Sequence, residues 1–310
     1  MSSKAYINYL PTRYMPLDKP NLKVLLFVDT EADFYYTVPS PHFKGTDVLK
    51  WRLNKLAGRL FRYPWPSRKG FEVLLETFKR HNQKAVFCIS GHLYLKECDG
   101  SYHFGIRRPE NPWYHSIIGK DWYHWDKGGN YLTHPGIYLG DLIEKENKNP
   151  LFEFGLHGFA HEALTLESRE VIDSIVKTAK HAASLAGITP AWFACPFELT
   201  EDENDPDKVF SCVRKNGIKK MFYSGKDNGL QIKRYFSVSS IIKEHGMEKY
   251  WISGYFEGTS SRSHIRKIMQ DIEAHRNKDA VYCLGTHDFT HKNADNVGAI
   301  VKFLKERGFS

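Results

Sequence analysis

Runs of apolar residues recur along the chain with two different periodicities. Leu22 to Val28 form an apolar run rich in β-forming side chains, as expected of a strand that is buried on both faces. Residues 69–83 space their apolar positions three and four apart, which predicts an amphipathic helix. The same reasoning predicts further strands over residues 85–90, 151–157, 191–197, 219–225 and 280–287, and further helices over 137–146, 166–187, 205–217, 261–277 and 296–308.

Strands and helices therefore alternate, which is typical of a parallel sheet with helical crossovers. Residues 228–260 are ambiguous, with strand-like runs at 234–242 and 250–256, and residues 91–135 are irregular. A chain of 310 residues can form one α/β barrel of about 200–250 residues with insertions. We predict a leader over residues 1–21 and a single domain over 22–310, with an aromatic insertion at about 91–135.

Polar residues follow several of the predicted strands. Asp29 and Glu31 follow the first strand, the pair His157 and His161 follows the strand at 151–157, and His287 follows the last one. In parallel α/β folds the carboxyl ends of the strands meet at one mouth, where chemistry collects. We therefore expect these side chains to converge.

The residue types suit a divalent metal with open coordination positions. Two histidines and one carboxylate form such a ligand set. His157 and His161 are four residues apart, and a helical turn would point both rings to one side. Asp29 and Glu31 are two apart on an extended segment, so one could bind the metal while the other acts as a base. His287 could then protonate a leaving amine.

The histidine spacing alone is weak support, because the chain has 15 histidines. A second pair with the same spacing, His287 and His291, exists, and we interpret His291 as having no site role.

Four segments strengthen the interpretation when they are taken in order: FVDTEAD (27–33), HGFAHE (157–162), FACPFE (193–198) and CLGTHD (283–288). They resemble the motifs of polysaccharide deacetylases with the NodB homology domain, carbohydrate esterase family 4, nearest to the amino-sugar deacetylase and deformylase branch. The resemblance covers roughly residues 22–308. It implies a distorted (β/α)7-type barrel and a metal, usually zinc. It also implies hydrolysis of an N-acyl group from a sugar.

The base, metal-ligand and acid positions of the family have counterparts in this chain. The resemblance implies Asp29 as the base, Glu31, His157 and His161 as metal ligands, and His287 as the acid. Asp29 and Glu31 could exchange roles, and Asp33 is a further candidate.

The sequence departs from the family at three places. An arginine that often tethers the base is replaced by Ala194. The aspartate that tunes the acid histidine has no clear counterpart, with Asp227 as the nearest candidate. A strand that often follows the final helix is nearly absent, because the chain stops at Ser310.

Four residues are candidates for substrate contact: Pro196 and Phe197 of the third motif, and Trp122 and Trp125 of the aromatic insertion. Indole rings stack well on sugars. The insertion could equally pack as ordinary core.

Composition and charge indicate the kind of substrate and the cellular location to expect. The net charge of +8 suits an anionic substrate, such as a nucleotide- or lipid-linked sugar, or peripheral contact with an anionic membrane surface. No nucleic-acid-binding motif is present. The five cysteines form no C-x-x-C pair, and neither a signal peptide nor a membrane span is visible, so we expect a reducing, cytoplasmic location.

The sequence thus predicts a zinc-dependent carbohydrate N-deacetylase of surface polysaccharide biosynthesis. Two alternatives stay open. One is a hydrolase of C–N bonds in a small amide or ureide. The other is a metal-containing carbohydrate-binding protein without turnover.

Overall fold

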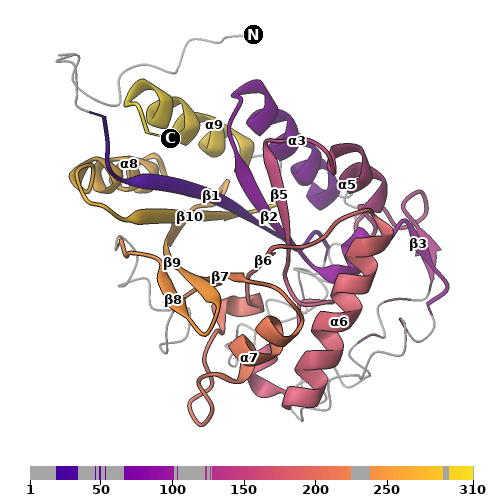
Figure 1. Ribbon diagram of the computed structural model, residues 1–310. Helices are drawn as coiled ribbons and strands as arrows, with labels where there is room; N and C mark the ends of the chain where they lie inside the picture. Colours follow the sequence, from indigo (N-terminus) through magenta and orange to yellow (C-terminus); the bar gives the residue numbers. More distant parts are fainter. Residues whose placement is uncertain are drawn as a thin grey trace.

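A computed structural model of the chain has a closed barrel of parallel strands at its centre (Figure 1). The strand order is β10-β1-β2-β5-β6-β7-β9, and β9 pairs again with β10 to close the ring. A short strand, β8, pairs antiparallel with β9 outside the ring. This seven-stranded arrangement confirms the predicted (β/α)7-type barrel.

The structure describes residues 19–33, 46, 49, 53, 66–100, 103, 123, 126, 128–224, 238–288 and 293–309. Most of the predicted leader and much of the aromatic insertion lie outside these residues. The division into a leader and one domain therefore stays a prediction.

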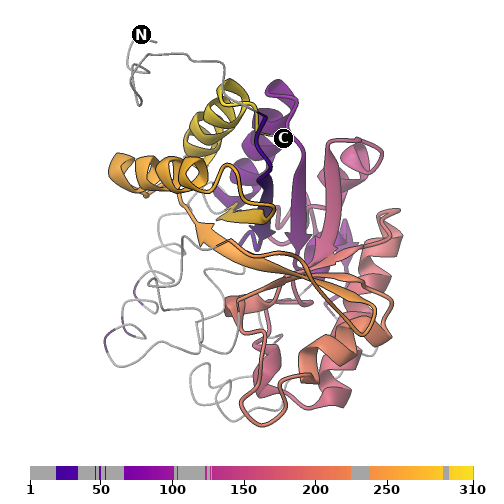
Figure 2. The ribbon, with the colours of Figure 1, turned by 60° about the vertical axis from the view of Figure 1, so that its left-hand side comes forward.

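The strands occupy nearly the predicted positions, with two short additions, β3 and β4, inside the insertion. Their bounds are β1 Lys23–Thr30, β2 Ala85–Ile89, β3 Glu97–Cys98, β4 Gly129–Asn130, β5 Phe152–Leu156, β6 Trp192–Phe193, β7 Lys220–Tyr223, β8 Ile242–Glu244, β9 Met247–Tyr255 and β10 Val281–His287. The ambiguous stretch supplies β8 and β9, and Figure 2 shows β9 joining the β7 side of the barrel to the β10 side.

Helices lie outside the barrel and connect the strands. The α-helices are α3 Pro66–Arg80, α5 Gly140–Glu146, α6 Arg169–Leu185, α7 Lys208–Lys215, α8 Arg262–Ala274 and α9 Asn293–Glu306, and the short 3-10 helices are η1 Gly91–Tyr94, η3 Leu164–Leu166 and η4 Pro196–Glu198. Helix α3 packs on α9, and α6 packs on α7 and η1. Ser168 caps α6 by accepting a hydrogen bond from Val171 N. Gly187, the predicted end of this helix, has φ +74°, a left-handed conformation that favours glycine after a helix.

The predicted strand at 191–197 is shorter than expected. Only Trp192 and Phe193 pair with the neighbouring strands. Proline at 196 cannot donate to a ladder, and Phe197 and Glu198 have left-handed φ values of +59° and +57°. The chain therefore turns sharply at the carboxyl end of β6.

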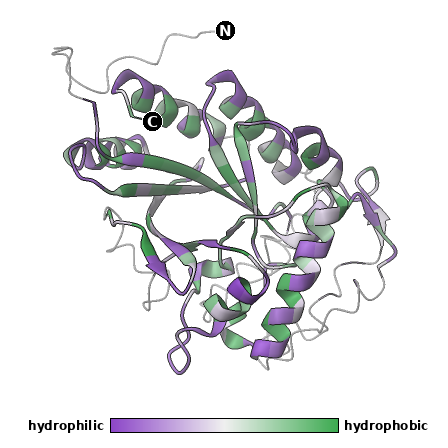
Figure 3. Cartoon of the chain, viewed as in Figure 1, coloured by the Kyte–Doolittle hydropathy of each residue, from purple (hydrophilic) through white to green (hydrophobic). Residues whose placement is uncertain are grey.

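Two apolar cores explain the strand pattern. Figure 3 shows that much of the length of the central strands is hydrophobic. A small core fills the barrel with Phe27, Val86, Cys88, Trp192, Ala194, Phe222, Ile252 and Cys283, and Phe27 stacks on Phe222 at 4.0 Å between ring centroids. A larger core lies between the barrel and the helices. It contains the strand residues that point outward, such as Val24, Leu26 and Val28 of β1. Strands buried on both faces read as continuous apolar runs.

Candidate metal and catalytic site

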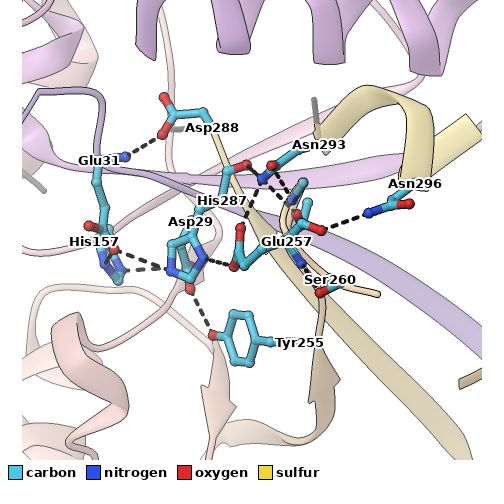
Figure 4. A network of polar contacts seen from close by, with 12 residues as sticks. Asp29, Glu31, His157, Tyr255, Glu257, Ser260, His287, Asp288, Asn293 and Asn296 are labelled. Atoms are coloured by element: carbon cyan, nitrogen blue, oxygen red, sulfur yellow. Dashed lines mark hydrogen bonds and ion pairs between the residues drawn. The ribbon is translucent and has the colours of Figure 1, made fainter. Parts of the chain in front are cut away.

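Polar side chains lie at one end of the barrel interior. In β1, Leu25 and Phe27 belong to the inner core, and Asp29 is the next residue on the same face of the strand. Asp29 pairs in register with His287, the last residue of β10. His157 comes directly after β5. The carboxyl ends of three strands thus bring these residues together (Figure 4).

Glu31, His157 and His161 form a buried cluster. Glu31 Oε1 lies 3.0 Å from His161 Nε2 and 3.4 Å from His157 Nε2. One ligand atom from each residue lies within 4.8 Å of the others. In the described part of the chain, His157 Nε2, His161 Nε2 and Glu31 Oε2 are buried with no hydrogen-bond partner. Buried polar atoms rarely stay unpaired, so these three residues fit a divalent cation bound among them.

The orientation of His157 is set by a backbone carbonyl. His157 Nδ1 lies 3.1 Å from the Ala194 carbonyl oxygen, and an N–H at this position leaves Nε2 free to face Glu31. Metal-binding histidines commonly donate their second N–H in this way. Burial alone would raise the pKa of Glu31, but His161 and His157 outweigh it and hold the pKa well below the usual value.

The segment from His157 to His161 is a tight turn and not the predicted helical turn. Gly158 has φ +67° and His161 has φ +62°. The Glu162 carboxylate accepts hydrogen bonds from Phe159 N at 2.8 Å and Ala160 N at 2.9 Å, which closes the turn. Both imidazoles still reach one cluster, although a left-handed histidine costs about 1–3 kcal/mol.

Asp29 is held by a residue that the sequence interpretation missed. The Tyr255 hydroxyl donates a hydrogen bond of 2.7 Å to Asp29 Oδ2, and His157 Nδ1 lies 3.7 Å from Asp29 Oδ1. Burial raises the pKa of Asp29, and the neighbouring histidines and Tyr255 oppose this effect. Tyr255 thus tethers the carboxylate, which Ala194 cannot do because its methyl group has no donor.

His287 has its own carboxylate partner. Its Nδ1 lies 2.5 Å from Glu257 Oε1, and Asn293 Nδ2 donates to the other Glu257 oxygen at 2.9 Å. The second ring nitrogen, Nε2, lies 3.5 Å from Glu31 Oε1. Burial lowers the pKa of His287, but Glu257 outweighs it and raises the pKa to about 10. Glu257 therefore partners the proposed acid, and Asp227, the candidate suggested by the sequence, lies outside the described residues.

Asp288 supports the segment after β1. Its Oδ1 accepts hydrogen bonds of 3.1 Å from the backbone N–H groups of Glu31 and Ala32. Burial raises the pKa of Asp288 to about 7, although both backbone groups oppose this. Asp288 thus positions Glu31 from the adjacent strand.

The other predicted residues are spread more widely. Asp33 hydrogen-bonds Ser67 at the start of α3, so its carboxylate is engaged away from the cluster. Pro196 is buried beside Gly158, and Phe197 packs edge-on against His161 with 4.3 Å between ring centroids. Trp122, Trp125 and His291 lie outside the described residues.

Sequence reasoning missed four residues of this site: Tyr255, Glu257, Glu162 and Asp288. Tyr255 and Glu257 lie at the end of the strand-like run that we left ambiguous, and Glu162 and Asp288 are the last letters of two quoted motifs. Their position at strand ends was the available signal.

Part of the sequence is similar to a known protein family. Residues 63–205 match the family described as polysaccharide deacetylase. No curated protein matches the sequence at a significant level. Among the described residues, no helix has the length and apolar character needed to cross a membrane.

Several solved structures are similar to this chain, and the first of those below shares its fold. A "putative polysaccharide deacetylase" from Mycobacterium smegmatis is 14% identical, with a TM-score of 0.55 over 95% of this chain and 86% of that one. A family 4 carbohydrate esterase from Streptomyces lividans, bound to acetate, is 12% identical with a TM-score of 0.43, over 94% and 91% of the two chains. A family 4 acetyl xylan esterase from Clostridium thermocellum, bound to cobalt, is 12% identical with a TM-score of 0.44, over 93% and 86%.

Proposed function

We propose that the chain hydrolyses an N-acyl group, acetyl or formyl, from an amino sugar, because residues 63–205 match the polysaccharide deacetylase family. The central observation is the pairing of Asp29 and His287 across β1 and β10, with the cluster of Glu31, His157 and His161 beside them. The proposed base, the proposed acid and the proposed metal ligands thus lie at one barrel end. This arrangement suits hydrolysis of an amide bond.

The proposed metal ligands are Glu31, His157 and His161, and zinc is the expected ion. When bound, a divalent metal would supply Lewis acidity that polarises water and the acyl carbonyl. Three protein ligands leave coordination positions open, which is typical of catalytic zinc sites. The unpaired buried atoms of the three residues favour this assignment over a hydrogen-bonded cluster.

Asp29 is the proposed general base. Its Oδ2 is occupied by Tyr255, whereas Oδ1 has no hydrogen-bond partner among the described residues. Oδ1 can therefore accept a proton from the attacking water. Glu31 contacts both metal histidines, so the geometry favours Glu31 as the ligand and Asp29 as the base, and not the exchanged roles.

His287 is the proposed general acid. Glu257 raises its pKa, so the imidazole is protonated at neutral pH and can donate a proton to the leaving nitrogen from Nε2. Nδ1 keeps its hydrogen bond to Glu257, and this bond orients the ring. The product is then a free amine and a carboxylic acid.

The substrate is proposed to be an amino sugar carried on a nucleotide or lipid phosphate, in a pathway to a surface polysaccharide. The net charge of +8 supports an anionic carrier. The alternative of a protein without turnover rested on the missing arginine at Ala194, and the hydrogen bond from Tyr255 to Asp29 weakens that argument.

The test is a panel of N-acetylated and N-formylated amino sugars, offered free, nucleotide-linked and polyprenyl-phosphate-linked. We expect amine and carboxylic acid to appear in equal amounts from the zinc-loaded protein, and only trace amounts after chelation. A panel of simple amides and ureides runs beside it. Turnover of that second panel alone would favour the small-amide alternative, and no turnover at all would favour the binding protein.

A further inference from the structure

A second cluster of ligand-type side chains lies behind the HGFAH turn. It combines four residues of the aromatic insertion, namely His92 of η1, Cys98 of β3, His103 and Asp126. His92 is fully buried, and His103 and Asp126 are exposed by only 7% and 6%. None of these residues belongs to the site at the barrel end. We call them the insertion cluster.

The four ligand atoms of the insertion cluster point at one another. Cys98 Sγ lies 3.5 Å from His103 Nε2 and 3.7 Å from His92 Nε2. Asp126 Oδ2 lies 2.9 Å from His92 Nε2, 2.9 Å from Cys98 Sγ and 2.5 Å from His103 Nε2. In a tetrahedral zinc site, sulfur and nitrogen ligands are roughly 3.5 Å apart, given their usual bond lengths. The sulfur–nitrogen distances already match this, and the carboxylate lies closer.

The orientation of His92 independently indicates a cation. Its Nδ1 lies 2.9 Å from the Ile137 carbonyl oxygen, a contact that is favourable only when Nδ1 donates an N–H. In the neutral ring, Nε2 then has a lone pair that faces an Asp126 oxygen at 2.9 Å. A cation between the two atoms turns this repulsion into coordination. A backbone carbonyl on the second nitrogen is the usual partner of a metal-binding histidine.

Further contacts would stabilise the two anionic ligands. The backbone N–H of Gly100 donates to Cys98 Sγ at 3.4 Å. Asp126 Oδ1 accepts from Gly128 N at 2.9 Å and from the Tyr138 hydroxyl at 3.3 Å. Such outer contacts orient a thiolate and a carboxylate toward a metal.

We propose that His92, Cys98, His103 and Asp126 bind a zinc ion in a structural site distinct from the catalytic cluster. A thiolate with two imidazoles suits zinc better than magnesium or calcium, and four protein ligands close the coordination shell. Zinc binding replaces the Cys98 thiol proton, which is released to solvent, and the thiolate and carboxylate together balance the two charges of the ion.

This zinc site would brace the turn that presents the catalytic histidines. Phe159, inside that turn, contacts the ring of His103 at 5.3 Å and the ring of His92 at 5.8 Å between centroids. The backbone N–H groups of Gly91 and His92 donate to Gly158 O at 3.0 Å and Phe159 O at 2.9 Å. The metal would therefore connect η1 and the rest of the insertion to the wall behind His157 and His161.

The test is metal content and cobalt spectroscopy of the full chain. We expect about two zinc ions per chain in the wild type, and about one in Cys98→Ser, in Asp126→Asn and in His161→Ala. Cobalt substitution should give a sulfur-to-cobalt charge-transfer band in the wild type and in His161→Ala, and the band should be lost in Cys98→Ser. Cys212→Ser is the matched control, because Cys212 is buried in α7 and should leave the band and the metal content unchanged.

Metal content that is unchanged in Cys98→Ser, or a wild-type cobalt spectrum without a thiolate band, would overturn the proposal. If Cys98→Ser does not fold, alkylation of the wild type decides. Cys98 should be protected from iodoacetamide in the zinc-loaded protein and modified after chelation, and equal modification in both states would contradict the site. Each readout is independent of catalytic activity, so the catalytic proposal can fail separately.

Discussion

The Tyr255 hydroxyl donates a 2.7 Å hydrogen bond to Asp29 Oδ2, whereas the methyl group of Ala194 cannot donate one. The bond leaves only Oδ1 of Asp29 to act as a base. It also lowers the pKa of a carboxyl group that burial otherwise raises. The position of the proposed base therefore depends on one phenol from β9, which adds to His157 and His287 in favouring the ionised carboxylate.

Tyr255→Phe should reduce turnover without loss of metal. A hydrogen bond to a charged group is worth about 1.5–3 kcal/mol, so the reduction should be about 10- to 100-fold. Because the bond lowers the pKa of Asp29, its removal raises that pKa, and the acidic limb of the activity profile should move to higher pH. Tyr250→Phe is the control, since its hydroxyl donates to Glu248 on the same strand. Equal effects in both variants would remove Tyr255 from the mechanism.

Glu257→Gln should move the alkaline limb of activity to lower pH. His287 must be protonated to act as the acid, so activity falls as pH rises through its pKa. Glu257 raises that pKa to about 10, and the neutral amide cannot do so. Glu273→Gln, which loses a partner of Arg307 near the surface, is the control. An alkaline limb that stays in place would exclude His287 as the titrating acid.

Asp29→Asn and Glu31→Gln should separate catalysis from metal binding. Glu31 Oε1 contacts both His157 and His161, so its amide variant should lose the catalytic metal. Asp29→Asn should keep the metal and lose turnover. Zinc analysis of both folded variants checks this, with His161→Ala as the reference for metal loss. The reverse pattern would exchange the roles of the two carboxylates.

Gly158→Ala should destabilise the turn before His161. Gly158 has φ +67°, and an added Cβ would lie 2.7 Å from Glu162 Oε2, the carboxylate that closes the turn. We expect a loss of about 1–3 kcal/mol in the free energy of unfolding and weaker metal binding. Gly246→Ala is the control, because its φ is +78° with no atom within 4 Å of the added Cβ. Both variants are compared by denaturant unfolding, and equal losses would mean that only backbone strain matters.

The barrel and much of its mouth follow from patterns that are local in sequence. The apolar runs and their spacing predict the strands and helices, and strand ends indicate where Asp29, His157 and His287 meet. Register alone does not show which polar residues then touch. Tyr255 and Glu257 come from a stretch with mixed periodicity, and their partners are more than 25 residues away in sequence.

The insertion cluster is harder still to foresee. Cys98 appears in the sequence as one unpaired cysteine among five, without a C-x-x-C partner. His103 and Asp126 lie in an irregular aromatic stretch, where no periodicity indicates which side chains converge. The four residues are up to 34 positions apart in sequence, and the fold brings them together.

The most direct test of the proposed catalytic site compares single turnovers of wild type, Asp29→Asn and His287→Gln on the best N-acyl amino sugar of the panel. All three proteins must have equal folded fractions and equal zinc content. The account predicts free amine and carboxylate from the wild type, and rates lower by about 10²- to 10⁴-fold in each variant, the usual contribution of acid–base catalysis. Near-wild-type rates in either zinc-loaded variant would contradict the role assigned to that residue, and near-wild-type rates in both would contradict the account.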